Sequence, residues 1–100
     1  MVYKIMVGTI KPEKLQTWNE NKEPFDILDE RKEIEQINWI EFLSAARRLF
    51  TEEVQVDWGS FAFKATKEQL KQLTEEYRAT IDNLDNFPDE SLGVVFIEMS

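Results

Sequence analysis

The residues best suited to binding or catalysis lie near the end of the chain, where four carboxylates fall within nine residues: Asp82, Asp85, Asp89 and Glu90. Clustered carboxylate oxygens are ligands that hard cations such as Ca²⁺ prefer. The spacing does not fit an EF-hand loop, because the glycine of its sharp turn is missing and Leu84 and Phe87 occupy positions that such a loop gives to oxygen ligands. The sequence therefore predicts a solvated acidic loop, and we expect neither a metal nor a cofactor.

A second candidate is Asp57, which precedes Trp58, Gly59 and Ser60. An acid beside an aromatic side chain and a serine suits a pocket rim, but an exposed strand carboxylate followed by a turn explains the same residues. Adjacent acids such as Glu52 and Glu53 are weak candidates for hydrolysis, since a working pair needs two environments that separate the pKa values. The chain has no His and no Cys, which removes the Ser-His-Asp form of catalysis, thiolate chemistry and disulfides. We expect no enzymatic activity.

Phe87 stands inside the acidic loop. An exposed aromatic beside carboxylates is typical of a protein interface, where Trp, Tyr and Phe are enriched. Alternatively, Phe87 folds back as a plug on the core. We predict a partner-binding surface made of six residues: Asp57, Asp82, Asp85, Phe87, Asp89 and Glu90.

The charge of the chain indicates the kind of partner. The net charge is −8, of which residues 1–50 carry −1 and residues 51–100 carry −7. Direct binding of nucleic acid is disfavoured, because phosphate contacts need clustered Lys and Arg. The same field attracts a basic protein, although it also serves solubility alone.

These observations favour a small acidic protein-interaction module that binds a basic partner, in concrete form an inhibitor or immunity-type protein. Two alternatives stay open. One is a small carboxylate-based enzyme or ligand-binding protein that uses Tyr3, Tyr77 or Lys64 in a pocket between helices and sheet. The other is a homo-oligomer that packs through an apolar helix at 39–50. No apolar stretch approaches the roughly 20 residues that span a bilayer, and no signal peptide is evident, so we expect no membrane contact and a cytoplasmic location.

The elements that position these residues follow from periodicity and capping. Alternating or apolar runs predict strands at 2–7, 54–58, 61–65 and 94–99. Gly59 and Ser60 suit a hairpin turn that opposes Val56 to Phe63 and Val54 to Ala65, with all apolar residues on one face.

Helices are predicted at 12–20, weakly at 26–36, at 39–50 and from Thr66 onward. Asn38 is a good cap for the third, and Ile37 with Phe42 forms a hydrophobic staple. Thr66 and Gln69 form a capping box for the last helix. The sequence thus predicts one α+β domain over residues 1–100, in the order β-α-α-β-β-α-β, with a mixed or antiparallel sheet packed by helices. A final crossover is expected to place the last strand parallel to a neighbour.

Overall fold

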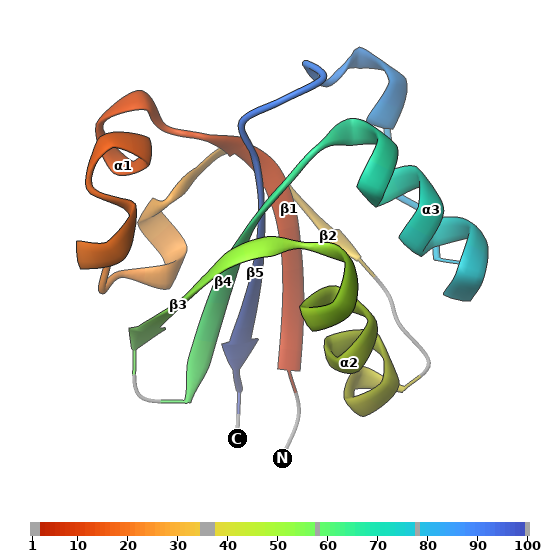
Figure 1. Ribbon diagram of the computed structural model, residues 1–100, viewed down its shortest axis with the longest axis horizontal. Coiled ribbons are helices and arrows are strands. Elements are labelled where there is room, and N and C mark those ends of the chain that lie inside the picture. The colour runs from red at the N-terminus through yellow and green to blue at the C-terminus, as the bar shows by residue number, and fades with distance from the viewer. Residues whose placement is uncertain (1–2, 35–37, 58, 78, 100) are drawn as a thin grey trace.

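The computed structural model describes residues 3–34, 38–57, 59–77 and 79–99, and of Asp57 it describes the backbone only. These residues form a five-stranded antiparallel sheet with the strand order β2-β1-β5-β4-β3 (Figure 1). The strands are β1 (Tyr3–Ile10), β2 (Leu28–Ile34), β3 (Thr51–Asp57), β4 (Ser60–Ala65) and β5 (Leu92–Glu98). The helices are α1 (Pro12–Gln16), α2 (Trp39–Leu49) and α3 (Lys67–Tyr77), with short 3-10 helices η1 (Trp18–Glu20), η2 (Pro24–Asp26) and η3 (Leu84–Asn86). The predicted α+β class is confirmed.

The sheet is covered on both faces, which explains why its central strands are apolar throughout. Helices α2 and α3 pack on one face of the sheet (Figure 1). On this face the ring of Phe96 contacts those of Phe42 and Phe63. The segment 11–27, which contains α1, η1 and η2, covers the other face and buries Trp18 and Ile27 there. Strand β1, for which the sequence predicted a strand at 2–7, lies between β2 and β5 in the interior of the sheet.

Both well-signalled helices begin where their capping residues predict. The side chain of Asn38 accepts hydrogen bonds from the backbone N–H groups of Ile40 and Glu41, at 3.0 and 3.2 Å. Thr66 and Gln69 form the reciprocal capping box, with side-chain to backbone distances of 3.2 and 3.0 Å. Each such cap contributes about 1 kcal/mol to stability. The Ile37 half of the predicted staple lies outside the described residues.

The weak helix predicted at 26–36 is wrong, because most of this segment is the edge strand β2. Only its ends face the core, where Leu28 pairs with Ile10 and Ile34 with Ile5. The residues between are largely exposed, and a bulge with Glu30 in the left-handed region (φ 49°) interrupts the alternation. A charged, bulged edge strand protects a sheet against edge-to-edge pairing, but it hides the period of two from the sequence.

The predicted hairpin exists, but its register and its single apolar face are wrong. Val54 lies opposite Ala62 rather than Ala65, and Gln55 lies opposite Phe61. Irregularities on both sides of these pairs, one with Glu52 at φ 51°, shift the strands. Val54 and Val56 consequently face the segment 11–27, whereas Phe61, Phe63 and Ala65 face α2 and α3. Trp58, which ends the strand predicted at 54–58, lies outside the described residues.

The expected parallel crossover is also wrong. Strand β5 inserts between β1 and β4 and runs antiparallel to both. A βαβ crossover requires that the two strands it connects run parallel to each other. The chain instead returns from α3 through the residues 79–91, which lie at one end of the sheet (Figure 1).

Candidate functional site

The predicted acidic loop runs back along α3 and is fastened to it. The backbone N–H of Lys67 donates to the carbonyl of Asp89 at 2.9 Å. Lys71 Nζ lies 2.9 Å from Asp85 Oδ1, and Lys67 Nζ lies 3.5 Å from Asp89 Oδ1. The hydrogen bond from Lys71 holds the pKa of the Asp85 carboxyl below its usual value. Two of the predicted partner-binding carboxylates therefore already have intramolecular partners.

Phe87 is a core residue. It is 5% exposed and belongs to the cluster beneath α2 and α3. Of the two interpretations of Phe87, the structure shows the plug, which ties the acidic loop to the fold. Phe87 is therefore not available as the exposed aromatic residue of the predicted partner-binding surface.

Asp57 lies apart from the other predicted site residues. It ends β3 and pairs through its backbone with Ser60 of β4. Figure 1 shows the β3–β4 turn and the loop after α3 at opposite ends of the sheet. The structure therefore places Asp85 and Asp89 side by side along α3, with Asp82 and Glu90 in the same loop, and Asp57 elsewhere.

The surface formed by α3 and the following loop remains negatively charged despite its local ion pairs. Four exposed carboxylates of α3 and the following loop have no ion-pair partner among the described residues, and we call them the acidic face: Glu68, Glu75, Asp82 and Glu90. Many of the cations, in contrast, are held in ion pairs, as Arg48 is by Glu76 at 2.7 Å. Among the described residues of this surface, the unpaired charge is negative.

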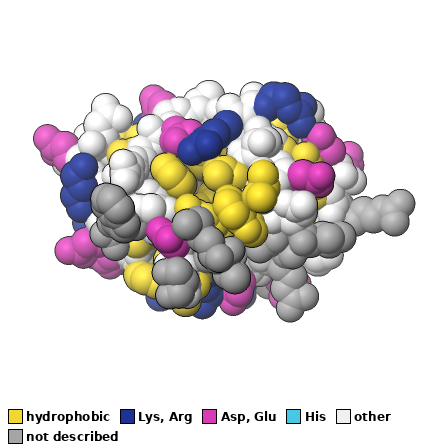
Figure 2. Space-filling view, turned by 90° about the horizontal axis from the view of Figure 1, so that it is seen from below, with side chains coloured by type: hydrophobic (Ala, Val, Ile, Leu, Met, Phe, Trp, Pro, Cys, Tyr) yellow, Lys and Arg dark blue, Asp and Glu magenta, His cyan; other side chains and the backbone are white. Residues whose placement is uncertain are grey.

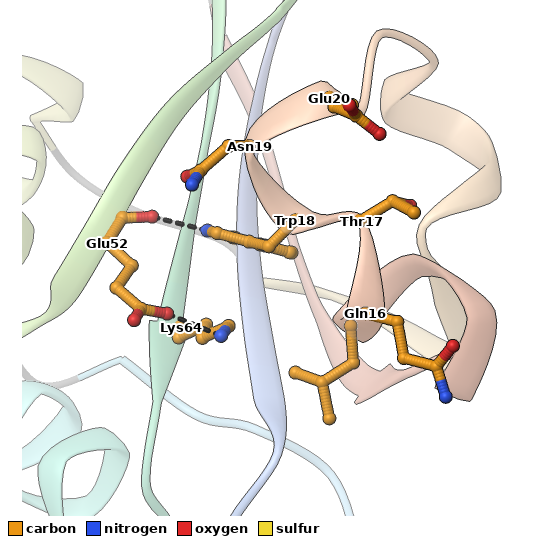
Figure 3. Close-up of a pocket in the computed structure, with 8 residues that line it drawn as sticks. Gln16, Thr17, Trp18, Asn19, Glu20, Glu52 and Lys64 are labelled. Atoms are coloured by element: carbon orange, nitrogen blue, oxygen red, sulfur yellow. Dashed lines mark hydrogen bonds and ion pairs between the residues drawn. The ribbon is translucent and has the colours of Figure 1, made fainter.

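A groove of about 380 Å³ lies beside Trp18 on the other side of the sheet (Figure 3). The indole Nε1–H donates to the carbonyl of Glu52 at 2.5 Å, and the Lys64 ammonium lies 5.8 Å from the ring centroid. Lys64 is also paired with Glu52 Oε2 at 2.5 Å. Because Trp18 is only 4% exposed, its faces are not open to a ligand. These contacts fasten the segment 11–27 to β3 and β4.

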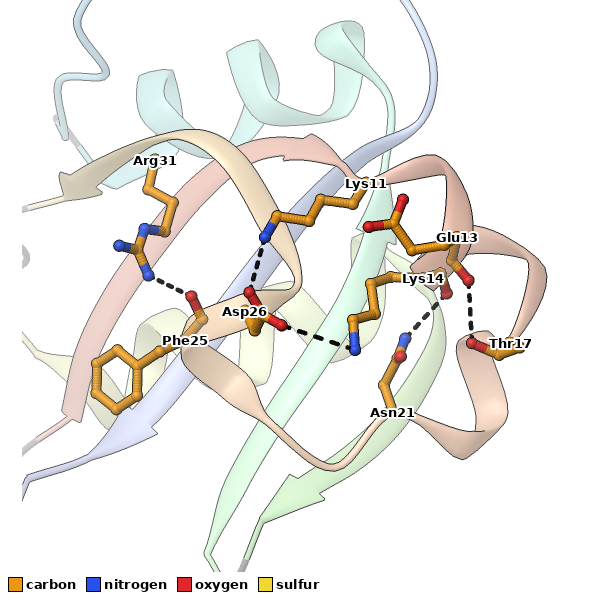
Figure 4. A network of polar contacts seen from close by, with 8 residues as sticks. All are labelled: Lys11, Glu13, Lys14, Thr17, Asn21, Phe25, Asp26 and Arg31. Atoms are coloured by element: carbon orange, nitrogen blue, oxygen red, sulfur yellow. Dashed lines mark hydrogen bonds and ion pairs between the residues drawn. The ribbon is translucent and has the colours of Figure 1, made fainter.

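A second polar network closes the same segment (Figure 4). Asp26 receives Lys11 Nζ at 2.7 Å and Lys14 Nζ at 3.9 Å. The hydrogen bond from Lys11 lowers the pKa of the Asp26 carboxyl and raises the pKa of the Lys11 ammonium. Asn21 is buried and donates to the carbonyl of Lys14 at 3.0 Å. The network is internally satisfied and is best explained as structural.

A row of aromatic rings crosses three elements at the end of the sheet where β1 begins. Tyr3 of β1 lies 4.7 Å from Trp39 of α2 and 6.5 Å from Phe61 of β4, measured between ring centroids. The Arg47 guanidinium lies 5.0 Å from the Phe61 centroid. The Tyr3 hydroxyl donates to the carbonyl of Gly59 at 2.8 Å. Trp39 and Phe61 are partly buried and pack against the core.

Tyr3 should make the stability of the protein fall at alkaline pH. Burial raises the pKa of its phenol above the ordinary value of about 10, and the Glu98 carboxylate raises it further, while Arg47 acts in the opposite sense. The unfolded chain therefore loses this proton first, and the free energy of unfolding decreases as pH rises from about 10 through the folded-state pKa. Urea unfolding at a series of pH values should show a steeper alkaline decline for the wild type than for Tyr3→Phe. Parallel declines would contradict this role of Tyr3.

The described residues contain no group of three or more acidic, His or Cys side chains placed to hold a metal ion. None of their helices is long and apolar enough to cross a membrane. In comparisons with protein-family models, curated proteins and solved structures, nothing matched the chain. Its function has to be inferred from its own geometry and charge.

Proposed function

We propose that this protein is a non-enzymatic protein-binding module that engages a basic surface of its partner through the acidic face. The observation that carries the proposal is the set of four exposed carboxylates, Glu68, Glu75, Asp82 and Glu90, that have no ion-pair partner among the described residues. Its concrete form is an inhibitor or immunity-type protein, which covers a basic functional surface such as that of a nucleic-acid-binding protein.

Electrostatics supports this choice of partner. A net charge of −8 on 100 residues attracts a cationic protein over a distance of about 10 Å at ordinary ionic strength. Complementary charge raises the rate of association by roughly ten- to a thousandfold, and it rejects acidic competitors. The same field repels the phosphates of nucleic acids, so it favours a protein as the ligand.

The rigidity of the acidic face supports the same proposal. The loop that follows α3 is held by the Lys67 and Lys71 contacts and by buried Phe87. The backbone that carries Asp82 and Glu90 is therefore positioned before a partner arrives, and binding does not have to order the loop. A pre-organised surface loses less conformational entropy on binding than a mobile loop does.

Charge reversal on the acidic face should weaken binding without unfolding the protein. We expect the triple variant Glu75→Lys, Asp82→Lys, Glu90→Lys to lose roughly tenfold or more in affinity. These three side chains are exposed, and the Asp85 and Asp89 ion pairs stay intact. The partner would be recovered by affinity capture from the native host, eluted with rising salt and identified by mass spectrometry. Its affinity for each variant would then be measured by calorimetry.

A matched control separates the surface from the net charge. Glu13, Glu20 and Glu23 are exposed and belong to the segment 11–27 on the opposite side of the sheet. Reversing them to Lys changes the net charge by the same amount, and this control should bind nearly as well as the wild type. Equal losses in both variants would rule out the acidic face as the contact. Recovery of no basic protein would count against the proposed function itself.

A further inference from the structure

One end of the molecule exposes a continuous group of apolar side chains (Figure 2). We call it the aromatic patch: Trp39, Ile40 and Phe61 provide its accessible area, and the buried side chains of Tyr3 and Leu43 support them. Ile40 is the most exposed member of the patch, at 59%. Leu43 and Arg47 follow Ile40 at three and seven residues, so all three lie on one side of α2.

The composition of this patch resembles that of binding hot spots. Trp, Tyr and Arg are the residues that most often dominate the energy of protein interfaces, and partly buried rings held by their neighbours lose little entropy on binding. Here Tyr3 packs between Trp39 and Phe61, and the row is closed by Arg47. The exposed Ile40 side chain adds apolar area, and removing this area from water on binding is favourable.

The charges around the patch indicate what it would bind. Arg47 is already committed, since its Nε and Nη2 donate to the two carboxylate oxygens of Glu53 at 3.0 and 3.2 Å. Glu41 is exposed beside Ile40, and Glu98 acts electrostatically on Tyr3 from the end of β5. Neither Glu41 nor Glu98 has an ion-pair partner among the described residues. Among the residues that the structure describes, the uncompensated charge at this rim is negative.

We infer that the aromatic patch is a docking site for a basic amphipathic segment of a protein partner. Apolar side chains of the segment cover Trp39, Ile40 and Phe61, and its cations face Glu41 and Glu98. The inference rests on the proposed function for the sign of the partner's charge, but it concerns a surface separate from the acidic face. A second copy of this chain is a poorer occupant, because each copy carries a charge of −8.

The test uses a synthetic amphipathic peptide of Leu and Arg, about 18 residues or five helical turns long. A scrambled peptide of the same composition keeps the charge but lacks the apolar face. The amphipathic peptide should bind the wild type about tenfold more tightly than the scrambled one. Nuclear magnetic resonance should show that it shifts the indole N–H signal of Trp39, assigned with Trp39→Phe.

Two exposed apolar residues supply matched variants. Ile40→Ser should remove most of the preference for the amphipathic peptide, whereas Phe25→Ser, at a residue that is 51% exposed and lies outside the aromatic patch, should leave it unchanged. Equal effects of the two variants, or equal binding of the two peptides, would overturn the docking site. Binding of both peptides equally, lost in the Glu75, Asp82 and Glu90 reversal, would overturn the docking site while leaving the proposed function standing. Binding of neither peptide would count against both.

Self-association is the remaining outcome and needs its own measurement. Sedimentation velocity of the wild type without peptide should show a monomer at every concentration tested. A dimer that Ile40→Ser dissociates would assign the aromatic patch to a second copy and overturn the basic segment as its occupant.

Discussion

Replacing Phe96 by alanine should lower the free energy of unfolding by about 3–5 kcal/mol. Phe96 is fully buried in β5, the central strand, with ring centroids 5.7 Å from Phe63 and 6.0 Å from Phe42. Truncation removes its transfer free energy and leaves a cavity that the flanking strands and α2 cannot readily fill. Since domains of this size are stable by only about 5–15 kcal/mol, the variant should lose a large part of its stability.

Urea unfolding of Phe96→Ala followed by circular dichroism would give this value, provided that the slope m stays constant. Phe25→Ala is the matched control, because the same atoms are removed from an exposed position, and its stability should change by no more than about 0.5 kcal/mol. If the two variants unfolded at the same urea concentration, the central packing described for β5 would be incorrect.

Replacing Phe87 by alanine should cost about 3 kcal/mol, an effect on folding and not only on binding. Its ring is the part of the acidic loop that enters the core, together with Ile81. Its loss should also loosen the return from Asn83 to Ser91, two residues that both adopt positive φ angles and depend on neighbouring contacts for that conformation.

Chemical unfolding gives the loss for Phe87→Ala, and hydrogen exchange locates it, with faster exchange expected in residues 81–91 than in β1. An unchanged free energy of unfolding, combined with weaker partner binding, would instead make Phe87 an interface anchor. This outcome would restore the alternative that its burial argues against.

Helices α2 and α3 were predictable because their capping signals are local. Asn38 and the pair Thr66 and Gln69 satisfy backbone N–H groups within one turn, so the sequence shows both the residues and their partners. The strands β1, β4 and β5 were also visible, since interior strands are apolar on both faces. Because both faces of these strands are apolar, their sequence does not indicate on which face of the sheet each side chain lies.

The wrong predictions concern elements whose conformation depends on tertiary contacts. Strand β2 is charged and bulged, so it lacks the alternation that marks a strand. The hairpin register depends on an irregularity at Glu52, a residue type with no preference for positive φ. Lys71 pairs with Asp85 of the returning loop rather than with a carboxylate one turn away on its own helix.

The candidate site was only partly accessible from the sequence for the same reason. Asp82, Asp85, Asp89 and Glu90 lie within nine residues of each other, so the sequence was enough to place them in one loop. The aromatic patch joins β1, α2 and β4, and no spacing in the sequence brings Tyr3, Trp39 and Phe61 together. Only the sheet order places them side by side.

The central claim, electrostatic capture of a basic protein by the acidic face, is tested most directly by the salt dependence of the association rate with the recovered partner. Stopped-flow mixing at ionic strengths from about 0.01 to about 1 M spans a change in screening length from roughly 30 to 3 Å. We predict that the association rate constant falls at least about tenfold over this range, with a smaller change in the dissociation rate. The Glu75, Asp82 and Glu90 reversal should flatten this dependence. An association rate that is the same at all salt concentrations would contradict the claim.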